Sequence, residues 1–181
     1  MGNIILTSIN FDVLIDDLKN NIFLNHKLIF SAIYEDLVTL CDNNFICYKS
    51  NMSIIKCRKK NDTDHKGISY FENISRTVGE SRANCKSRIN KIIHDLYGNE
   101  IVLPENWMSD DIVYSIGEML DRISIEFIKQ MHFMSNSDDI KKINASKKWE
   151  GRVRKYLLQK LEEITIKQFY EISEESRTYN V

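Results

Sequence analysis

The stretch VYSIGEMLDRISIEFIKQMHFM, residues 113–134, decides the fold class. Its apolar residues recur three or four positions apart, which is the spacing of one face of an α-helix. At 100° per residue, an arc of about 80° contains all of the following: Val113, Ile116, Leu120, Ile123, Phe127, Met131 and Met134. Ser109 and the two aspartates after it predict the start of this helix, because they suit the free N–H groups of a helix N-terminus. We therefore expect a long helix with one narrow face in a hydrophobic core.

The same spacing predicts more helices on both sides of this stretch. They cover residues 11–23, 27–41 and 68–97, and a last helix runs from Asp138 to beyond Tyr170. Long helices separated by so short a break as the one at Asn136 should fold back on each other as an antiparallel hairpin.

One segment does not follow the helical pattern. In NFICYKSNMSIIKC, β-branched and aromatic residues flank a turn-like Lys49-Ser50-Asn51, so we expect a small β-hairpin from Phe45 to Cys57. The polar, aperiodic RKKNDTDHKG that follows, residues 58–67, is predicted to be a loop.

The composition agrees with a mainly α protein. The 181 residues include 6 Gly and 1 Pro, too few for the frequent turns of an all-β chain. We expect one domain over residues 1–181, a helical bundle of antiparallel long-helix hairpins with a small β-hairpin. Residues 1–58 form the N-terminal helices and the hairpin, and residues 68–175 form the long-helix core of the bundle.

Charge and motifs exclude several classes of protein. With 25 basic and 26 acidic residues, the chain has no overall attraction to nucleic acid or to anionic membranes. No apolar run approaches the roughly 18 residues of a membrane span, and the N-terminus lacks the basic start of a signal peptide. The four cysteines lack framework spacing, so we expect reduced thiols and a cytoplasmic protein. The chain has no glycine-rich phosphate loop and no metal-site spacing of Cys and His, so we expect neither cofactor nor metal.

The helix of residues 113–134 also carries the polar residues most open to a functional interpretation. Glu118 and Arg122 lie opposite the apolar stripe at the spacing of a favourable ion pair, which is typical of a solvated face. Asp121 and His132 lie at the edge of the stripe, where a neighbouring helix could partly desolvate them. Ligand binding by Glu118, Asp121, Arg122 and His132 is therefore an alternative to a purely structural role.

The residues SIGEMLDRISIEFIKQMHF, preceded by ENWMSDD, support this alternative through a resemblance. They resemble an S-x-G-x-x-x-D-R-x-S-I-x-x-x-K-x-x-H element of an uncharacterised family of bacterial all-helical domains, often associated with surface-polysaccharide gene sets. The resemblance extends loosely over residues 68–170 and is specific only from Ser115 to His132. The chain differs from the family in the hairpin region, and it lacks the family's Gln-Arg-Asn run after Cys85. It implies a helical fold and no established reaction, and it draws attention to Asp121, Arg122 and His132.

Two further patterns remain open. Arg88 and His94 have the R-x5-H spacing of helical ribonucleases that act at a dimer interface, a spacing that also arises often by chance. The last helix brings a basic stripe within an arc of about 60°, which is either a solvated face or a contact for nucleic acid phosphates: Lys141, Lys148, Arg152 and Lys155.

The leading hypothesis for function is a non-catalytic binding or assembly module that forms a homodimer or binds a protein partner. One alternative is a helical ribonuclease that uses Arg88 and His94. The other is a pocket for a small anionic ligand or a nucleotide sugar around Asp121, Arg122 and His132.

Overall fold

A computed structural model describes residues 5–60, 64–97, 115–136 and 140–178. In chain order its elements are α1 (Asp12–Asp17), the π-helical turn η1 (Leu18–Ile22), α2 (Lys27–Lys60), α3 (His65–Tyr97), α4 (Ile116–Asn136) and α5 (Ile140–Thr178). The predicted helix start at Ser109 lies outside the described residues.

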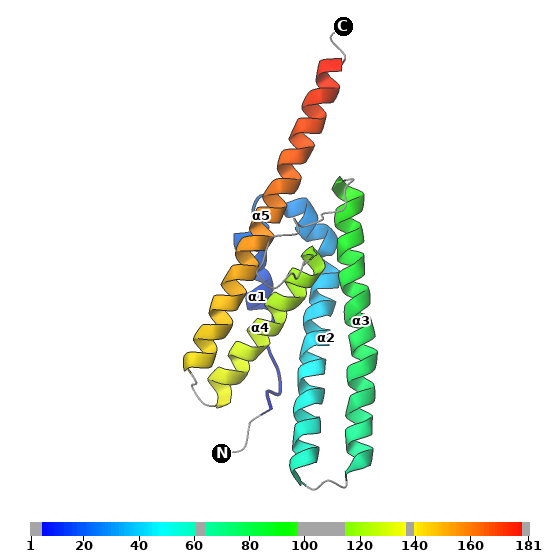
Figure 1. Ribbon diagram of the computed structural model, residues 1–181, viewed down its shortest axis with the longest axis vertical. Helices are drawn as coiled ribbons and strands as arrows, with labels where there is room; N and C mark the ends of the chain where they lie inside the picture. The colour runs from blue at the N-terminus through cyan, green and yellow to red at the C-terminus, as the bar shows by residue number, and fades with distance from the viewer. Residues whose placement is uncertain (1–4, 61–63, 98–114, 137–139, 179–181) are drawn as a thin grey trace, which may run out of the picture.

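The long helices form two antiparallel hairpins, as the sequence predicts (Figure 1). Helix α2 lies beside α3, and α4 lies beside α5. Helix α4 also packs against both α2 and α3, so it joins the two hairpins. The C-terminal part of α5 extends beyond the other helices (Figure 1). The protein is therefore a helical bundle in which α4 holds the central position.

The predicted β-hairpin is wrong, because the described residues contain no strand and residues 45–57 belong to α2. The buried side of α2 explains the error. On the side that faces α4, Leu37 and Cys41 continue into Asn44, and on the side that faces α3, Asn43 and Ser50 are buried as well. These polar residues interrupt the apolar pattern in the sequence while keeping the helical register, and burial against two neighbouring helices overrides local β propensity.

The core draws on every helix. Its fully buried side chains come from the N-terminal segment and from both hairpins. They include Leu18, Phe23, Ile33, Ile89, Leu120 and Leu157. The apolar stripe of α4 predicted from the sequence is confirmed at Ile116, Leu120 and Ile123, which are all buried. Within the described residues, no disulfide joins the four cysteines. Across the described helices, none is long and apolar enough to cross a membrane.

Candidate functional site

The N-terminus of α4 is held against α3 by a cap. Ser115 and Glu118 form a capping box, in which the Ser115 amide donates to Glu118 Oε2 at 3.1 Å and the Glu118 amide donates to Ser115 Oγ at 3.3 Å. Asn90 of α3 adds to it by donating to Ser115 Oγ and accepting from the Gly117 amide, both at 2.9 Å. Glu118 therefore caps the helix, and the predicted ion pair with Arg122 is not formed.

One turn further along α4, Asp121 is the centre of a buried polar network. Its carboxylate accepts two hydrogen bonds from Arg82 of α3. Arg82 Nε donates to Oδ1 at 3.2 Å, and Nη2 donates to Oδ2 at 2.8 Å. The carboxylate also accepts one from Asn44 Nδ2 of α2 at 2.8 Å, and the same amide group donates to Ser124 Oγ. Three helices thus meet at one carboxylate. We call this group of four residues the Asp121 network: Asn44, Arg82, Asp121 and Ser124.

The surroundings of Arg82 favour its charged form. Burial alone would disfavour the charge on Arg82, but the hydrogen bonds and charge of Asp121 outweigh it and raise the pKa of the guanidinium. Asn44 Oδ1 is buried without a hydrogen-bond partner in the described structure. An unsatisfied buried carbonyl costs free energy. This cost offsets part of the stabilisation from the hydrogen bonds that Asn44 donates to Asp121 and Ser124.

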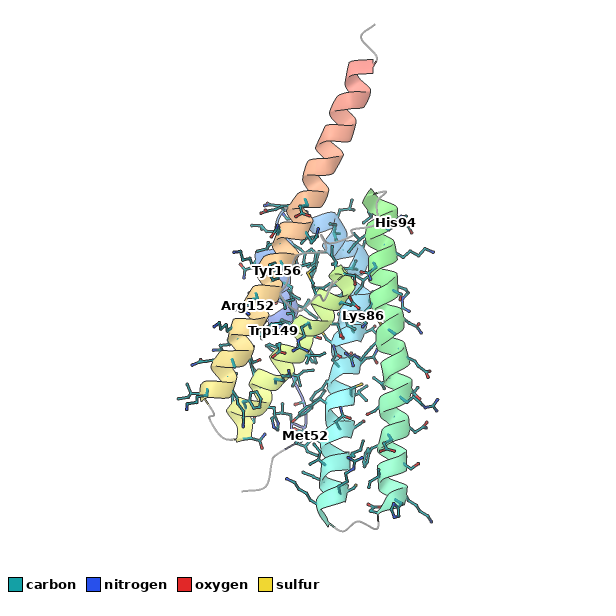
Figure 2. All side chains as sticks on the ribbon, in the orientation of Figure 1. Met52, Lys86, His94, Trp149, Arg152 and Tyr156 are labelled. Carbon is teal, nitrogen blue, oxygen red and sulfur yellow. The ribbon has the colours of Figure 1, made fainter. Side chains whose placement is uncertain are left out.

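A pocket of about 240 Å³ lies beside this network, between α2, α3 and α4. Its lining combines apolar and polar side chains. Met52, which Figure 2 labels on α2, belongs to the apolar part. The lining residues are Asn44, Cys47, Tyr48, Asn51, Met52, Arg82, Ile125, Ile128 and Lys129.

Cys47 is the one thiol in this lining. Burial raises its pKa, and the neighbouring Arg82 opposes the increase without cancelling it. The thiol therefore stays protonated near neutral pH and is a poor nucleophile.

Tyr48 connects the pocket to His132. The tyrosine hydroxyl lies 2.7 Å from His132 Nδ1, and Asn136 Nδ2 lies 3.0 Å from the same nitrogen. Burial raises the pKa of Tyr48, so the phenol keeps its proton near neutral pH. Burial, and secondarily the charge of Lys142 on α5, lowers the pKa of His132. The neutral imidazole is thus the form that fits its surroundings.

We expect stability to fall in acid partly because of His132. Its pKa is lower in the folded than in the unfolded state, so the unfolded state binds the proton more tightly. Stability is therefore lost as pH falls through the ordinary histidine value of 6.5. Urea unfolding at pH values about one unit above and below this value should show a smaller pH effect for His132→Gln than for the wild type. Equal pH effects in the two proteins would contradict this role. His26, whose pKa burial also lowers, contributes equally to both.

Arg122 lies on another side of α4 from Asp121. It pairs with the buried Glu126 at 3.0 Å and lies over the ring of Trp149 on α5, 5.6 Å from the centroid. Glu126 also pairs with Lys129 at 2.9 Å and accepts from Ser146 Oγ of α5. The predicted trio of Asp121, Arg122 and His132 therefore does not converge, since each contacts a different partner.

The residues of the ribonuclease alternative are not brought together either. Arg88 donates from Nε to Asp36 Oδ1 of α2 at 2.7 Å. His94 is half exposed, contacts Asp95, and lies near the C-terminal end of α3 (Figure 2). Their six-residue separation turns them about 120° apart on the helix, and neither lines the pocket beside the Asp121 network.

The basic stripe is exposed, as expected of a solvated face. Figure 2 shows Arg152 on α5 with Trp149 and Tyr156. In the part of the chain that the structure describes, the stripe residues form no ion pair: Lys141, Lys148, Arg152 and Lys155.

The sequence prediction missed Asn44, Cys47 and Arg82. A signal was present, because Arg82 lies one turn before Cys85 on the stripe that continues through Ile89 and Ile93, all three of which are buried. A charged residue in register with a buried stripe needs a buried partner.

Comparison of the chain with protein-family models, with curated proteins and with solved structures finds no match. Among the described residues, no group of three or more His, Cys, Asp or Glu side chains is arranged to hold a metal ion.

Proposed function

We propose that this protein is a non-catalytic helical binding module whose binding site is the pocket between α2, α3 and α4. The observation that carries the proposal is the cavity of about 240 Å³ beside the Asp121 network. Arg82 and Asp121, with side chains 24% and 10% exposed, hold the three helices in one arrangement. A cavity lined by apolar side chains with a few fixed polar groups is the usual form of a small-molecule site.

The chemistry of the lining favours binding over catalysis. A nucleophilic cysteine needs a lowered pKa and an adjacent base, whereas the pKa of Cys47 is raised. His132 is not part of the lining, and its Nδ1 contacts the hydroxyl of Tyr48, which is. The polar groups of the pocket are therefore suited to recognising a ligand.

The volume limits the size of the ligand. At about 30 Å³ for each water-sized group, 240 Å³ holds on the order of ten non-hydrogen atoms. A nucleotide sugar is several times larger, so of the two ligand classes expected from the sequence, the small anionic one suits this pocket.

The test is a binding measurement with three probes of one shape: hydrocinnamate, its amide, and the cationic amine phenylpropylamine. At least one should bind with a Kd of about 1 mM, a typical affinity for a ligand of this size. Ligand-observed NMR titration measures the Kd directly.

Two tryptophan variants locate the binding. Met52→Trp should fill the pocket and weaken binding at least about tenfold, equivalent to about 1.4 kcal/mol. Met134→Trp, at an exposed position of α4 outside the lining, is the matched control and should bind as the wild type does. The proposal fails if no probe binds, or if both variants bind as tightly as the wild type.

Self-association, a protein partner and contact of the basic stripe with nucleic acid remain predictions from the sequence. Light scattering of the purified protein would give its oligomeric state.

A further inference from the structure

The polar residues that line the pocket have more free hydrogen-bond donors than free acceptors. Lys129 Nζ has three N–H groups and donates one of them, to Glu126. Asn51 Oδ1 accepts from Ser75, while its amide nitrogen has no partner in the described structure. The contacts of Arg82 with Asp121 use Nε and Nη2, which leaves the Nη1 donors, one of which can serve the Cys47 sulfur.

The Tyr48 oxygen and Asn51 Oδ1 each have one partner already, and the other acceptors near the pocket are used or enclosed. Asp121 accepts from Arg82 and Asn44, and the Asn44 carbonyl has less than 1 Å² of exposed surface, too little for a ligand atom to reach. Burial keeps the Cys47 thiol protonated. A ligand in this pocket is therefore met by N–H groups, and the complementary ligand supplies acceptor oxygens.

The charges around the pocket favour a single negative charge. The two charged residues that line the pocket, Arg82 and Lys129, are cations, and each pairs with one carboxylate, Asp121 or Glu126. Glu126 has a second cation, Arg122, on another side of α4, so this group has one more positive than negative charge. The Lys129 side chain is 43% exposed, so it can turn toward a ligand while Arg122 and Ser146 continue to hold Glu126. A monoanion neutralises the group, whereas a dianion would leave an excess negative charge beside a buried carboxylate.

The apolar residues of the lining determine the rest of the ligand. Met52, Ile125 and Ile128 are apolar and come from both α2 and α4. They offer no group that could replace the water lost from a polar ligand, so the part of the ligand that contacts them must be apolar.

We propose that the ligand is a small monocarboxylate with an apolar body. Its carboxylate lies among Lys129, Asn51 and the free edge of Arg82, and its body lies against Met52, Ile125 and Ile128. This inference rests on the proposed function, because it names the ligand class of the same pocket.

The experiment compares hydrocinnamate, hydrocinnamamide and phenyl phosphate with the full-length protein at a pH where the phosphate is a dianion. Hydrocinnamate should bind at least about tenfold more tightly than the amide, because only the acid gains charge-assisted hydrogen bonds. It should also bind more tightly than phenyl phosphate. Lys129→Gln should bring the affinity for the acid close to that for the amide, and Lys91→Gln, on the exposed side of α3, is the matched control and should change neither.

The outcomes separate this inference from the proposed function. If the acid and the amide bind equally and Met52→Trp weakens both, the pocket is the binding site and the carboxylate inference is wrong. Tighter binding of phenyl phosphate than of the acid would also overturn the inference. If Lys129→Gln keeps the full preference for the acid, the carboxylate does not lie at Lys129. Absence of binding by every probe would contradict both the inference and the proposed function.

Discussion

Asp121→Ala should destabilise the protein by about 3 kcal/mol or more, the usual cost of removing one partner of a buried ion pair. The variant leaves the Arg82 guanidinium, 24% exposed, without its carboxylate, and it leaves Asn44 Nδ2 with Ser124 as its remaining side-chain partner. Urea denaturation should therefore show a midpoint well below that of the wild type. Asp95→Ala, at a carboxylate whose side chain is 60% exposed, is the control and should change stability by less than about 0.5 kcal/mol.

A double-mutant cycle separates the pair from the individual residues. Arg82→Met combined with Asp121→Ala should cost less than the sum of the two single changes, because the double variant leaves neither charge buried alone. Additive effects would show that Arg82 and Asp121 do not stabilise each other, and a wild-type midpoint for Asp121→Ala would contradict the buried network itself.

Gly117→Ala and Gly151→Ala should change stability in opposite directions. A Cβ at residue 117 would lie 2.7 Å from the backbone carbonyl oxygen of Lys86 and 3.0 Å from its Cα. Because these are backbone atoms of α3, relief requires α3 and α4 to move apart, which should cost about 2 kcal/mol or more. At residue 151 nothing lies within 4 Å of the added Cβ, so alanine should stabilise α5 by about 0.5–1 kcal/mol through its higher helix propensity.

Thermal or urea unfolding of the two glycine variants is the measurement. Each variant controls for the other, since both add one methyl group within a helix. Equal stabilisation by both alanines would contradict the close approach of α3 and α4 at Gly117.

The helices were predictable because their burial follows a single period. In α4 the apolar residues Ile116, Leu120 and Ile123 face the core as their spacing requires. The hairpin prediction failed where that period is kept by polar residues. Asn43 and Ser50 are buried on one side of α2 and Asn44 on another, but in the sequence they resemble the polar positions of a turn.

The site was predictable only in part, for a related reason. Asp121 could be placed at the edge of the core from the register of α4, and Ser124 lies on the same side. Its partners lie 39 and 77 residues away along the chain. Arg88 attracted attention through its spacing to His94, whereas Arg82 is the arginine whose register brings it to Asp121. Which of several arginines pairs with a buried carboxylate depends on how α3 packs against α4, and periodicity within one helix does not specify this.

The motif residues of α4 all take part in its capping or in its contacts with neighbouring helices. Ser115 caps the helix, Gly117 allows the contact with α3, Asp121 and Ser124 bind the side chains of α2 and α3, and His132 contacts Tyr48. Each of these contacts positions α4 against the walls of the pocket.

The most direct test of the pocket as a binding site is an NMR measurement of nuclear Overhauser contacts between bound hydrocinnamate and methyl-labelled protein. The proposed site predicts that the same ligand contacts the Met52 methyl of α2 and the Ile125 and Ile128 methyls of α4, which line one cavity. Met134 and Ile140, which are exposed and outside the lining, should show no contact. Contacts confined to Met134 or Ile140, or an absence of contacts to Met52, Ile125 and Ile128, would contradict a ligand site between α2, α3 and α4.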